Sequence, residues 1–173
     1  MKTVFISYRR TNASWALAIS QNLTHSGFDV FLAYQGLASG DWERTIIENI
    51  RSRAHFLVVP SPSTLARCDD LRDLLRREIE EALKTRRNIV PLMLKGFDFR
   101  RPAITSRLTG KLASLKYYNG MTVPVEHFEA AMSKLREQFL NVSLDAVLHP
   151  PRSGFGQQTA KSLRLPPTLR SRT

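Results

Sequence analysis

The chain has 173 residues, 42% of them hydrophobic and 24% charged, which suits one globular domain with a core of its own. The single cysteine, Cys68, excludes an intramolecular disulfide and a cysteine-based metal cluster. No signal peptide is recognisable, and no apolar run approaches the roughly 20 residues that cross a bilayer. These features predict a cytoplasmic protein without a membrane partner.

The net charge of +11 raises the question of nucleic-acid binding, so its distribution matters. Five basic and no acidic residues lie between positions 150 and 173, which leaves +6 for residues 1–149. In that part, cations alternate with carboxylates, and a mixed face of this kind is typical of a solvated helix rather than a nucleic-acid interface. The proline content after residue 148 predicts a domain over 1–148, followed by a basic, disordered tail or linker over 149–173.

Two hydrophobic periods alternate along residues 1–148. Short β-branched and aromatic runs predict strands, which we place at Val4–Ser7, Phe28–Leu32, His55–Val59, Ile89–Leu94 and, more weakly, Leu112–Tyr117. Between them, apolar stripes at helical spacing predict helices, which we place around Trp15–Leu23 (capped by Asn12), Trp42–Ile50, Leu71–Leu83, the short segment Pro102–Gly110, and Phe128–Phe139.

This alternation predicts an α/β fold: a flavodoxin-like, open, five-stranded parallel sheet with helices on both faces. Strands such as Phe56-Leu57-Val58-Val59 are apolar on both sides, as parallel strands covered on two faces require. Ligands of such sheets bind beyond the carboxyl ends of the strands. The functional residues are therefore expected within 7–11, 33–42 and 61–70.

Two common uses of this fold do not match the strand ends. A phospho-receiver domain needs carboxylates after the first and third strands, whereas this chain has Ser7-Tyr8-Arg9-Arg10 and Pro60-Ser61-Pro62. The glycine-rich motifs that cradle nucleotide phosphates are also absent from the sequence. Arg9 and Arg10 are candidates for phosphate contacts, although two arginines after a strand are more often simply solvated.

Glu78 is the most unusual residue of the third predicted helix. At 100° per residue it falls on the apolar stripe, between Leu71 and Leu74 and one turn from Ala82. A carboxylate in that position must be paired or face a cavity, because its burial alone would cost too much free energy. Two interpretations stay open at this point: a salt bridge with an arginine in the core, or a carboxylate in a ligand pocket.

Other candidates carry less information. The four histidines are scattered over different elements without ligand spacing, so we predict no metal site. Ser7, Ser61 and Cys68 have no recognisable base partner for nucleophilic catalysis. Trp42 follows Gly40 at the start of a predicted helix, where an aromatic residue usually belongs to the core.

Several motifs together resemble TIR (Toll/interleukin-1 receptor) domains over roughly residues 3–141. Their order and spacing make the resemblance specific, although each motif alone is weak. The matching segments are Val4-Phe5-Ile6-Ser7-Tyr8-Arg9-Arg10, Gly27–Leu32, the loop segment Ala38-Ser39-Gly40-Asp41-Trp42, Leu75-Arg76-Arg77-Glu78-Ile79, and Asn88-Ile89-Val90-Pro91-Leu92. The resemblance is greatest to the NAD⁺-cleaving members, which include bacterial immune proteins and the axon-degeneration enzyme of animals.

This resemblance implies an enzyme that breaks the nicotinamide–ribose bond of NAD⁺, giving ADP-ribose or a cyclic form of it. NAD⁺ would be the substrate, and neither a cofactor nor a metal would be required. It also implies homotypic TIR–TIR assembly in a cytoplasmic protein of bacterial immune defence. A further interpretation, based on the proline-rich tail, is that the chain is part of a larger protein with an additional domain or effector partner. The implied catalytic residue is Glu78, and the implied substrate-binding residues are Tyr8, Arg9, Arg10, Gly40, Trp42 and Leu74.

Two positions depart from the pattern of the NAD⁺-cleaving members. Leu74 stands where they usually have a tryptophan, one turn before the glutamate, and Ala33 stands where their second strand usually ends in an aspartate. These departures favour the alternative function, a non-catalytic TIR interaction module that serves as a signalling adaptor.

Overall fold

The computed structural model describes residues 2–33 and 40–148. Five strands form one parallel sheet in the order β2-β1-β3-β4-β5. The strands are β1 (Thr3–Tyr8), β2 (Asp29–Leu32), β3 (His55–Val59), β4 (Asn88–Met93) and β5 (Met121–Thr122). The predicted flavodoxin-like sheet is therefore confirmed, and its first four strands lie where the hydrophobic runs place them.

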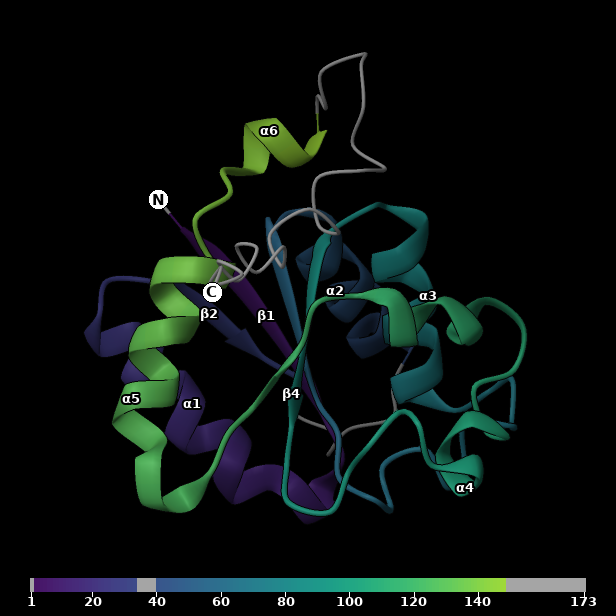
Figure 1. The fold of residues 1–173 in the computed structure, drawn as a ribbon. Helices are drawn as coiled ribbons and strands as arrows, with labels where there is room; N and C mark the ends of the chain where they lie inside the picture. Colours follow the sequence, from purple (N-terminus) through teal and green to yellow (C-terminus); the bar gives the residue numbers. More distant parts are fainter. Residues whose placement is uncertain (1, 34–39, 149–173) are drawn as a thin grey trace, which may run out of the picture.

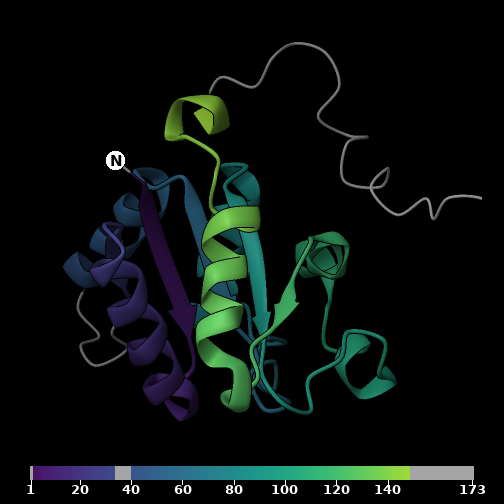
Figure 2. The same ribbon diagram turned by 60° about the vertical axis from the view of Figure 1, so that its left-hand side comes forward.

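Helices cover both faces of this sheet (Figures 1 and 2). Helices α1 and α5 lie on one face, and α2 and α3 lie on the other. The helices are α1 (Ala13–His25), α2 (Gly40–Arg51), α3 (Leu74–Lys84), α4 (Pro102–Thr105), α5 (Phe128–Lys134) and α6 (Leu144–Leu148), and the short helical turns are η1 (Arg10–Asn12), η2 (Gly110–Tyr117), η3 (Val125–His127) and η4 (Leu135–Phe139). Among the described residues, no helix has both the length and the apolar character needed to cross a membrane.

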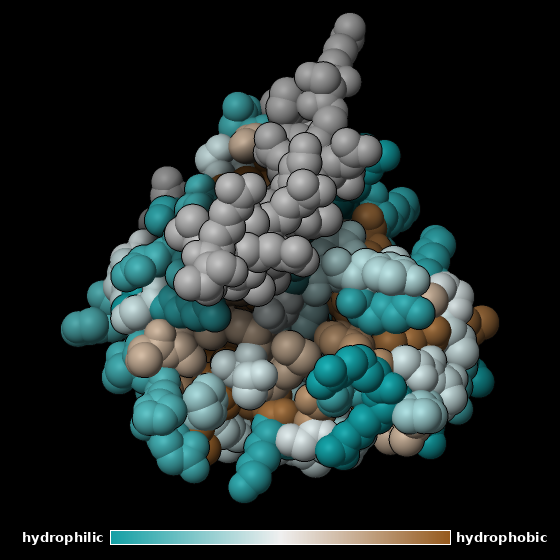
Figure 3. Space-filling model, viewed as in Figure 1, coloured by the Kyte–Doolittle hydropathy of each residue, from teal (hydrophilic) through white to brown (hydrophobic). Residues whose placement is uncertain are grey.

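The sheet separates two hydrophobic cores because successive side chains of a strand point to opposite faces. Val4 and Ile6 of β1 pack with Ile19 of α1, while Phe5 packs in the other core with Ile79 of α3. Both sides of β1 are thus fully buried, which explains why the strand is a continuous apolar run. Hydrophilic side chains lie around much of the edge of the face seen in Figure 3, as the mixed charge pattern predicts.

The weak strand prediction over Leu112–Tyr117 is wrong. This segment belongs to η2, and the fifth strand is the two-residue β5 that follows it. Leu112 and Leu115, three residues apart, are the buried side chains of the segment, which fits the three-residue period of a 3₁₀ helix and not the two-residue period of a strand.

The helix predicted over Leu71–Leu83 begins three residues later than expected, at Leu74, and Leu71 is 72% exposed. The reason is Asp73, which precedes α3 in an extended conformation and accepts a hydrogen bond from the backbone N–H of Arg76. An aspartate in this position satisfies an otherwise free helical N–H and ends the preceding loop. The apolar face that surrounds Glu78 is therefore made without Leu71.

Two smaller expectations also need correction. The predicted segment Pro102–Gly110 is helical only as far as Thr105, after which the chain continues in turns. Asn12 precedes α1 as predicted, but its side chain does not cap that helix. It donates hydrogen bonds instead to the Val59 carbonyl and to Thr64 and Ser61, and so joins the ends of β1 and β3.

Gly120 is required where β5 joins the sheet. A Cβ atom at this position would lie 2.7 Å from the carbonyl oxygen of Pro91, a backbone atom that cannot rotate away. We expect Gly120→Ala to lower the free energy of unfolding by about 2 kcal/mol, measured by urea denaturation. The control is Gly27→Asn, because Gly27 has φ +85° and open space around it, and asparagine tolerates that conformation. An equal loss in both variants would contradict this explanation.

Candidate active site

The candidate site forms where β1 and α3 meet. Glu78 lies in the second turn of α3 and is fully buried on the side of the sheet that faces α2 and α3. The Ser7 hydroxyl, next to the last residue of β1, donates a hydrogen bond to Glu78 Oε2. Glu78 Oε1 is also buried and has no hydrogen-bond partner among the described residues. Half of this carboxyl group is therefore unsatisfied, which is rare for a buried polar group and needs an explanation.

Of the two interpretations of Glu78, the salt bridge in the core is not found among the described residues. The nearby buried arginine, Arg9, pairs with Asp73 instead. Burial raises the pKa of Glu78 from 4.5 to about 8, and the charge of Asp73 adds to this, whereas the Ser7 hydrogen bond and the charge of Arg9 lower it. At neutral pH the buried carboxyl is therefore mainly protonated in this closed arrangement.

Arg9 is the centre of a second buried group of side chains. Its guanidinium donates to both carboxylate oxygens of Asp73, at 2.5 and 2.8 Å, and its Nε donates to the Thr64 carbonyl at 2.8 Å. The Cys68 sulfur lies 3.5 Å from Arg9 Nη2 and 3.7 Å from Asp73 Oδ2, and burial raises the thiol pKa to about 11. A thiol with so high a pKa is a poor nucleophile.

That Arg9 borders a substrate cleft stays a prediction. In the structure described, Arg9 is only 6% exposed, and both terminal nitrogens of its guanidinium donate to Asp73. Arg10, by contrast, is exposed at the start of η1 and remains available to an anionic ligand. Arg9 follows β1 in an extended conformation, whereas Arg10 already begins η1, so the two neighbouring arginines have different surroundings.

Of the remaining predicted site residues, Trp42 and Leu74 lie on the same side of the sheet as Glu78, whereas Tyr8 belongs to the core on the opposite side. Trp42, in the first turn of α2, and Leu74, the first residue of α3, are half-buried against the core that contains Phe5 and Ile79. The Trp42 ring packs on Phe31, with 6.4 Å between ring centroids, and its Nε1 is buried without a partner among the described residues. Tyr8 is 4% exposed at the end of β1.

Part of the predicted loop before α2 lies outside the described residues. Gly40 is the first residue of α2, and residues 34–39, which precede it, are not described. The predicted tail over 149–173 likewise lies outside the described residues, so the domain boundary near 148 stays a prediction.

Sequence reasoning missed two residues of this site, Ser7 as a partner of Glu78 and Asp73 as the partner of Arg9. Asp73 carried a readable signal, because an aspartate directly before an apolar-periodic run is a helix N-cap signature. Ser7 carried none, since its partner lies 71 residues away in the chain.

Among residues 2–33 and 40–148, no group of histidine, cysteine, aspartate and glutamate side chains could hold a metal ion.

The chemical capacity of the site follows from the unsatisfied carboxyl oxygen. Once ionised, a carboxylate beside apolar and aromatic side chains can accept hydrogen bonds from ligand hydroxyls and stabilise a nearby positive charge. The full burial of Glu78 means that surrounding residues must move before a ligand reaches it.

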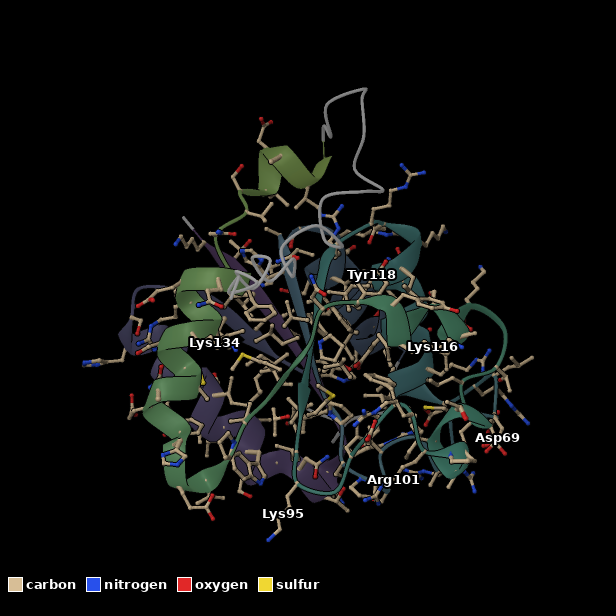
Figure 4. All side chains as sticks on the ribbon, in the orientation of Figure 1. Asp69, Lys95, Arg101, Lys116, Tyr118 and Lys134 are labelled. Carbon is tan, nitrogen blue, oxygen red and sulfur yellow. The ribbon has the colours of Figure 1, made fainter. Side chains whose placement is uncertain are left out.

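The carboxyl edge of the sheet also carries exposed cations. Lys95 and Arg101, labelled in Figure 4, lie with Arg10 in the segments that follow the carboxyl ends of the strands.

The fold and this buried carboxyl define an α/β domain with its candidate site at the carboxyl edge of a parallel sheet. Residues 4–151 match the family model described as TIR domain. The chain belongs to the TIR domain family.

Two relatives and one solved structure are similar to this chain. The chain is 33% identical over 159 residues to NAD(+) hydrolase sarm1 of Drosophila melanogaster, covering 87% of the chain and 11% of that protein. It is 29% identical over 136 residues to NAD(+) hydrolase tir-1 of Caenorhabditis elegans, covering 76% and 14%. The chain thus spans little more than a tenth of these relatives. The CMP N-glycosidase BcmB of Clostridium botulinum has a TM-score of 0.49 at 14% identity, covering 78% of this chain and 98% of that one.

Proposed function

We propose that this TIR domain cleaves the bond between nicotinamide and ribose in NAD⁺, with Glu78 as the catalytic carboxylate. The products would be nicotinamide and ADP-ribose, linear or cyclised. The observation that carries the proposal is the buried Glu78 carboxyl, with one oxygen unsatisfied and no arginine partner among the described residues. The two relatives named above as NAD(+) hydrolases support the choice of substrate.

The chemistry of the nicotinamide–ribose bond explains how a single carboxylate can promote its cleavage. Nicotinamide leaves as a neutral molecule, and positive charge develops on the ribose as the bond breaks. An anionic Glu78 next to the ribose stabilises this charge. Water then adds to the ribose carbon and releases a proton to give ADP-ribose, or a nucleophilic atom of the same molecule bonds to that carbon to give the cyclic form. Ribose hydroxyls would donate to the oxygen that lacks a partner in the closed arrangement.

The raised pKa of Glu78 fits the same scheme. In the closed arrangement burial keeps the carboxyl mostly protonated at neutral pH, since its pKa is about 8. The nicotinamide ring of NAD⁺ is cationic, and an adjacent positive charge favours the ionised form of a carboxyl group. Substrate binding would therefore itself generate the catalytic carboxylate, while Trp42 and Leu74 provide apolar walls at the half-buried edge of the site.

We assign the cationic, exposed Arg10 to the phosphates of NAD⁺, because a guanidinium pairs well with phosphate oxygens. The activity would serve bacterial immune defence in the cytoplasm, as the resemblance to bacterial immune TIR proteins implies. Activity would depend on homotypic assembly, in which a second copy of the domain completes the site around the closed carboxyl. The alternative, a non-catalytic interaction module, is favoured by Leu74 and Ala33 in place of the usual tryptophan and aspartate.

If cleavage depends on assembly, the specific activity should depend on protein concentration. If a neighbouring copy completes the site, nicotinamide release per molecule of protein should rise at least tenfold between dilute and concentrated protein, and further with a crowding agent. The measurement is chromatography of the reaction with NAD⁺ over a concentration series. A specific activity that is measurable but independent of protein concentration would contradict the role of assembly, and would leave cleavage itself intact.

A further inference from the structure

The helix that carries Glu78 is attached to β1 at two points. At its start, Asp73 pairs with Arg9, just after the end of β1. Five residues further along, Glu78 accepts the hydrogen bond from Ser7, which precedes Arg9 by two residues. The two attachments therefore join neighbouring residues of the strand end to successive turns of one helix.

Asp73 performs two tasks with one carboxylate. Its Oδ2 accepts from the backbone N–H of Arg76 at 3.0 Å, which fixes the first turn of α3, and the same carboxylate binds Arg9 through both oxygens. The Arg9 and Asp73 side chains are each 7% exposed. A two-bond guanidinium–carboxylate pair in such a buried place holds its partners in one geometry.

We propose that Arg9 and Asp73 are positioning residues for Glu78: their ion pair fixes α3 against the end of β1 and sets the charge balance around the carboxyl group. This assigns the first arginine of Tyr8-Arg9-Arg10 to the support of the site and not to the substrate. The effect of these two residues on the rate of NAD⁺ cleavage rests on the proposed function. Their effect on the charge of Glu78 does not, because it is a property of the folded chain.

The opposite charges of Arg9 and Asp73 should have opposite, measurable effects on the pKa of Glu78. Of the charged groups near Glu78, the negative Asp73 raises its pKa and the positive Arg9 lowers it, while Cys68, between the two, keeps its proton because burial raises its pKa to about 11. Removing one member of the ion pair leaves the other uncompensated. Loss of Arg9 should therefore raise the pKa of Glu78, and loss of Asp73 should lower it.

The test is a carbon-13 NMR titration of glutamate-labelled protein, in which Glu78→Gln identifies the Glu78 carboxyl signal. We expect Arg9→Gln to raise the pKa of Glu78 and Asp73→Asn to lower it, each by about half a unit to one unit. Asparagine still caps a helix, so Asp73→Asn should fold. The matched control is Arg53→Gln, which removes another arginine–aspartate pair, with Asp29 of β2, and should leave the pKa unchanged.

If both variants shift the pKa of Glu78 in the same direction, or neither shifts it, the proposal is overturned. A purely structural ion pair gives no reason for the two variants to shift this pKa in opposite directions. If Arg9→Gln does not fold, Asp73→Asn alone decides: a lowered pKa supports the proposal and an unchanged or raised one overturns it. Where cleavage is measurable, both variants should lose kcat at least tenfold with KM changed less than threefold. Absence of any cleavage by the unaltered protein would reject the proposed function, and the titration would still decide the charge balance.

Discussion

Glu78→Gln is expected to lower the rate of nicotinamide release from NAD⁺ by about 10²- to 10³-fold, the range typical for loss of one transition-state stabilising group. Glutamine has the shape of a glutamic acid side chain and can still bond Ser7, so the fold should remain intact. It cannot become negatively charged, however, and the developing positive charge on the ribose loses its stabilisation. The loss should appear mainly in kcat, since the amide can still accept hydrogen bonds from ribose hydroxyls.

The matched control for this variant is Glu81→Gln, on the same helix. Glu81 pairs with Arg51 of α2 and lies away from Ser7, so its replacement should change kcat less than twofold. Steady-state kinetics at fixed protein concentration provide the comparison. A Glu78→Gln variant that is folded and keeps more than a tenth of the activity would exclude Glu78 as the catalytic carboxylate.

The second large effect concerns stability as a function of pH. The pKa of Glu78 is about 8 in the folded chain and 4.5 as its ordinary value, so between these values the unfolded chain releases a proton that the folded chain retains. Rising pH therefore favours unfolding. The contribution of protonated Glu78 to the free energy of unfolding is fully present below about pH 4.5 and is lost as the pH rises to about 8. Glu78→Gln lacks this titration and should not suffer the loss.

We expect the free energy of unfolding of Glu78→Gln, relative to the unaltered protein, to increase by about 1 kcal/mol for each pH unit between 5 and 8. Urea denaturation of both proteins at several pH values gives this difference, in which the titration of other groups cancels. Glu81→Gln should show no such slope. A constant difference over the whole pH range would mean that Glu78 is already ionised in the folded protein, against the burial described above.

Much of the fold follows from local patterns that a sequence displays directly. Strands buried on both faces, such as His55–Val59, are short apolar runs, and helices such as Ala13–His25 place Ile19 and Leu23 on one stripe. The strand expected at Leu112–Tyr117 was wrong because a 3₁₀ turn and a short strand of similar composition cannot be told apart without their packing partners.

The site was predictable in part. Glu78 is conspicuous because a charged residue interrupts an apolar stripe, and its burial is confirmed. That no arginine of the described residues pairs with it was not predictable, since Arg9 and Asp73 form their ion pair across 64 residues of chain. The contrast between buried Arg9 and exposed Arg10 likewise depends on where the strand ends and on the position of α3.

Cleavage of NAD⁺ through Glu78 can be tested by incubating concentrated protein with NAD⁺ and following nicotinamide by chromatography beside the Glu78→Gln variant. We expect nicotinamide release by the unaltered protein, with an equal amount of ADP-ribose or its cyclic form, and almost none by the variant. No release at any protein concentration, with and without a crowding agent, would contradict it and favour the interaction module; equal release by both proteins would place the catalysis elsewhere.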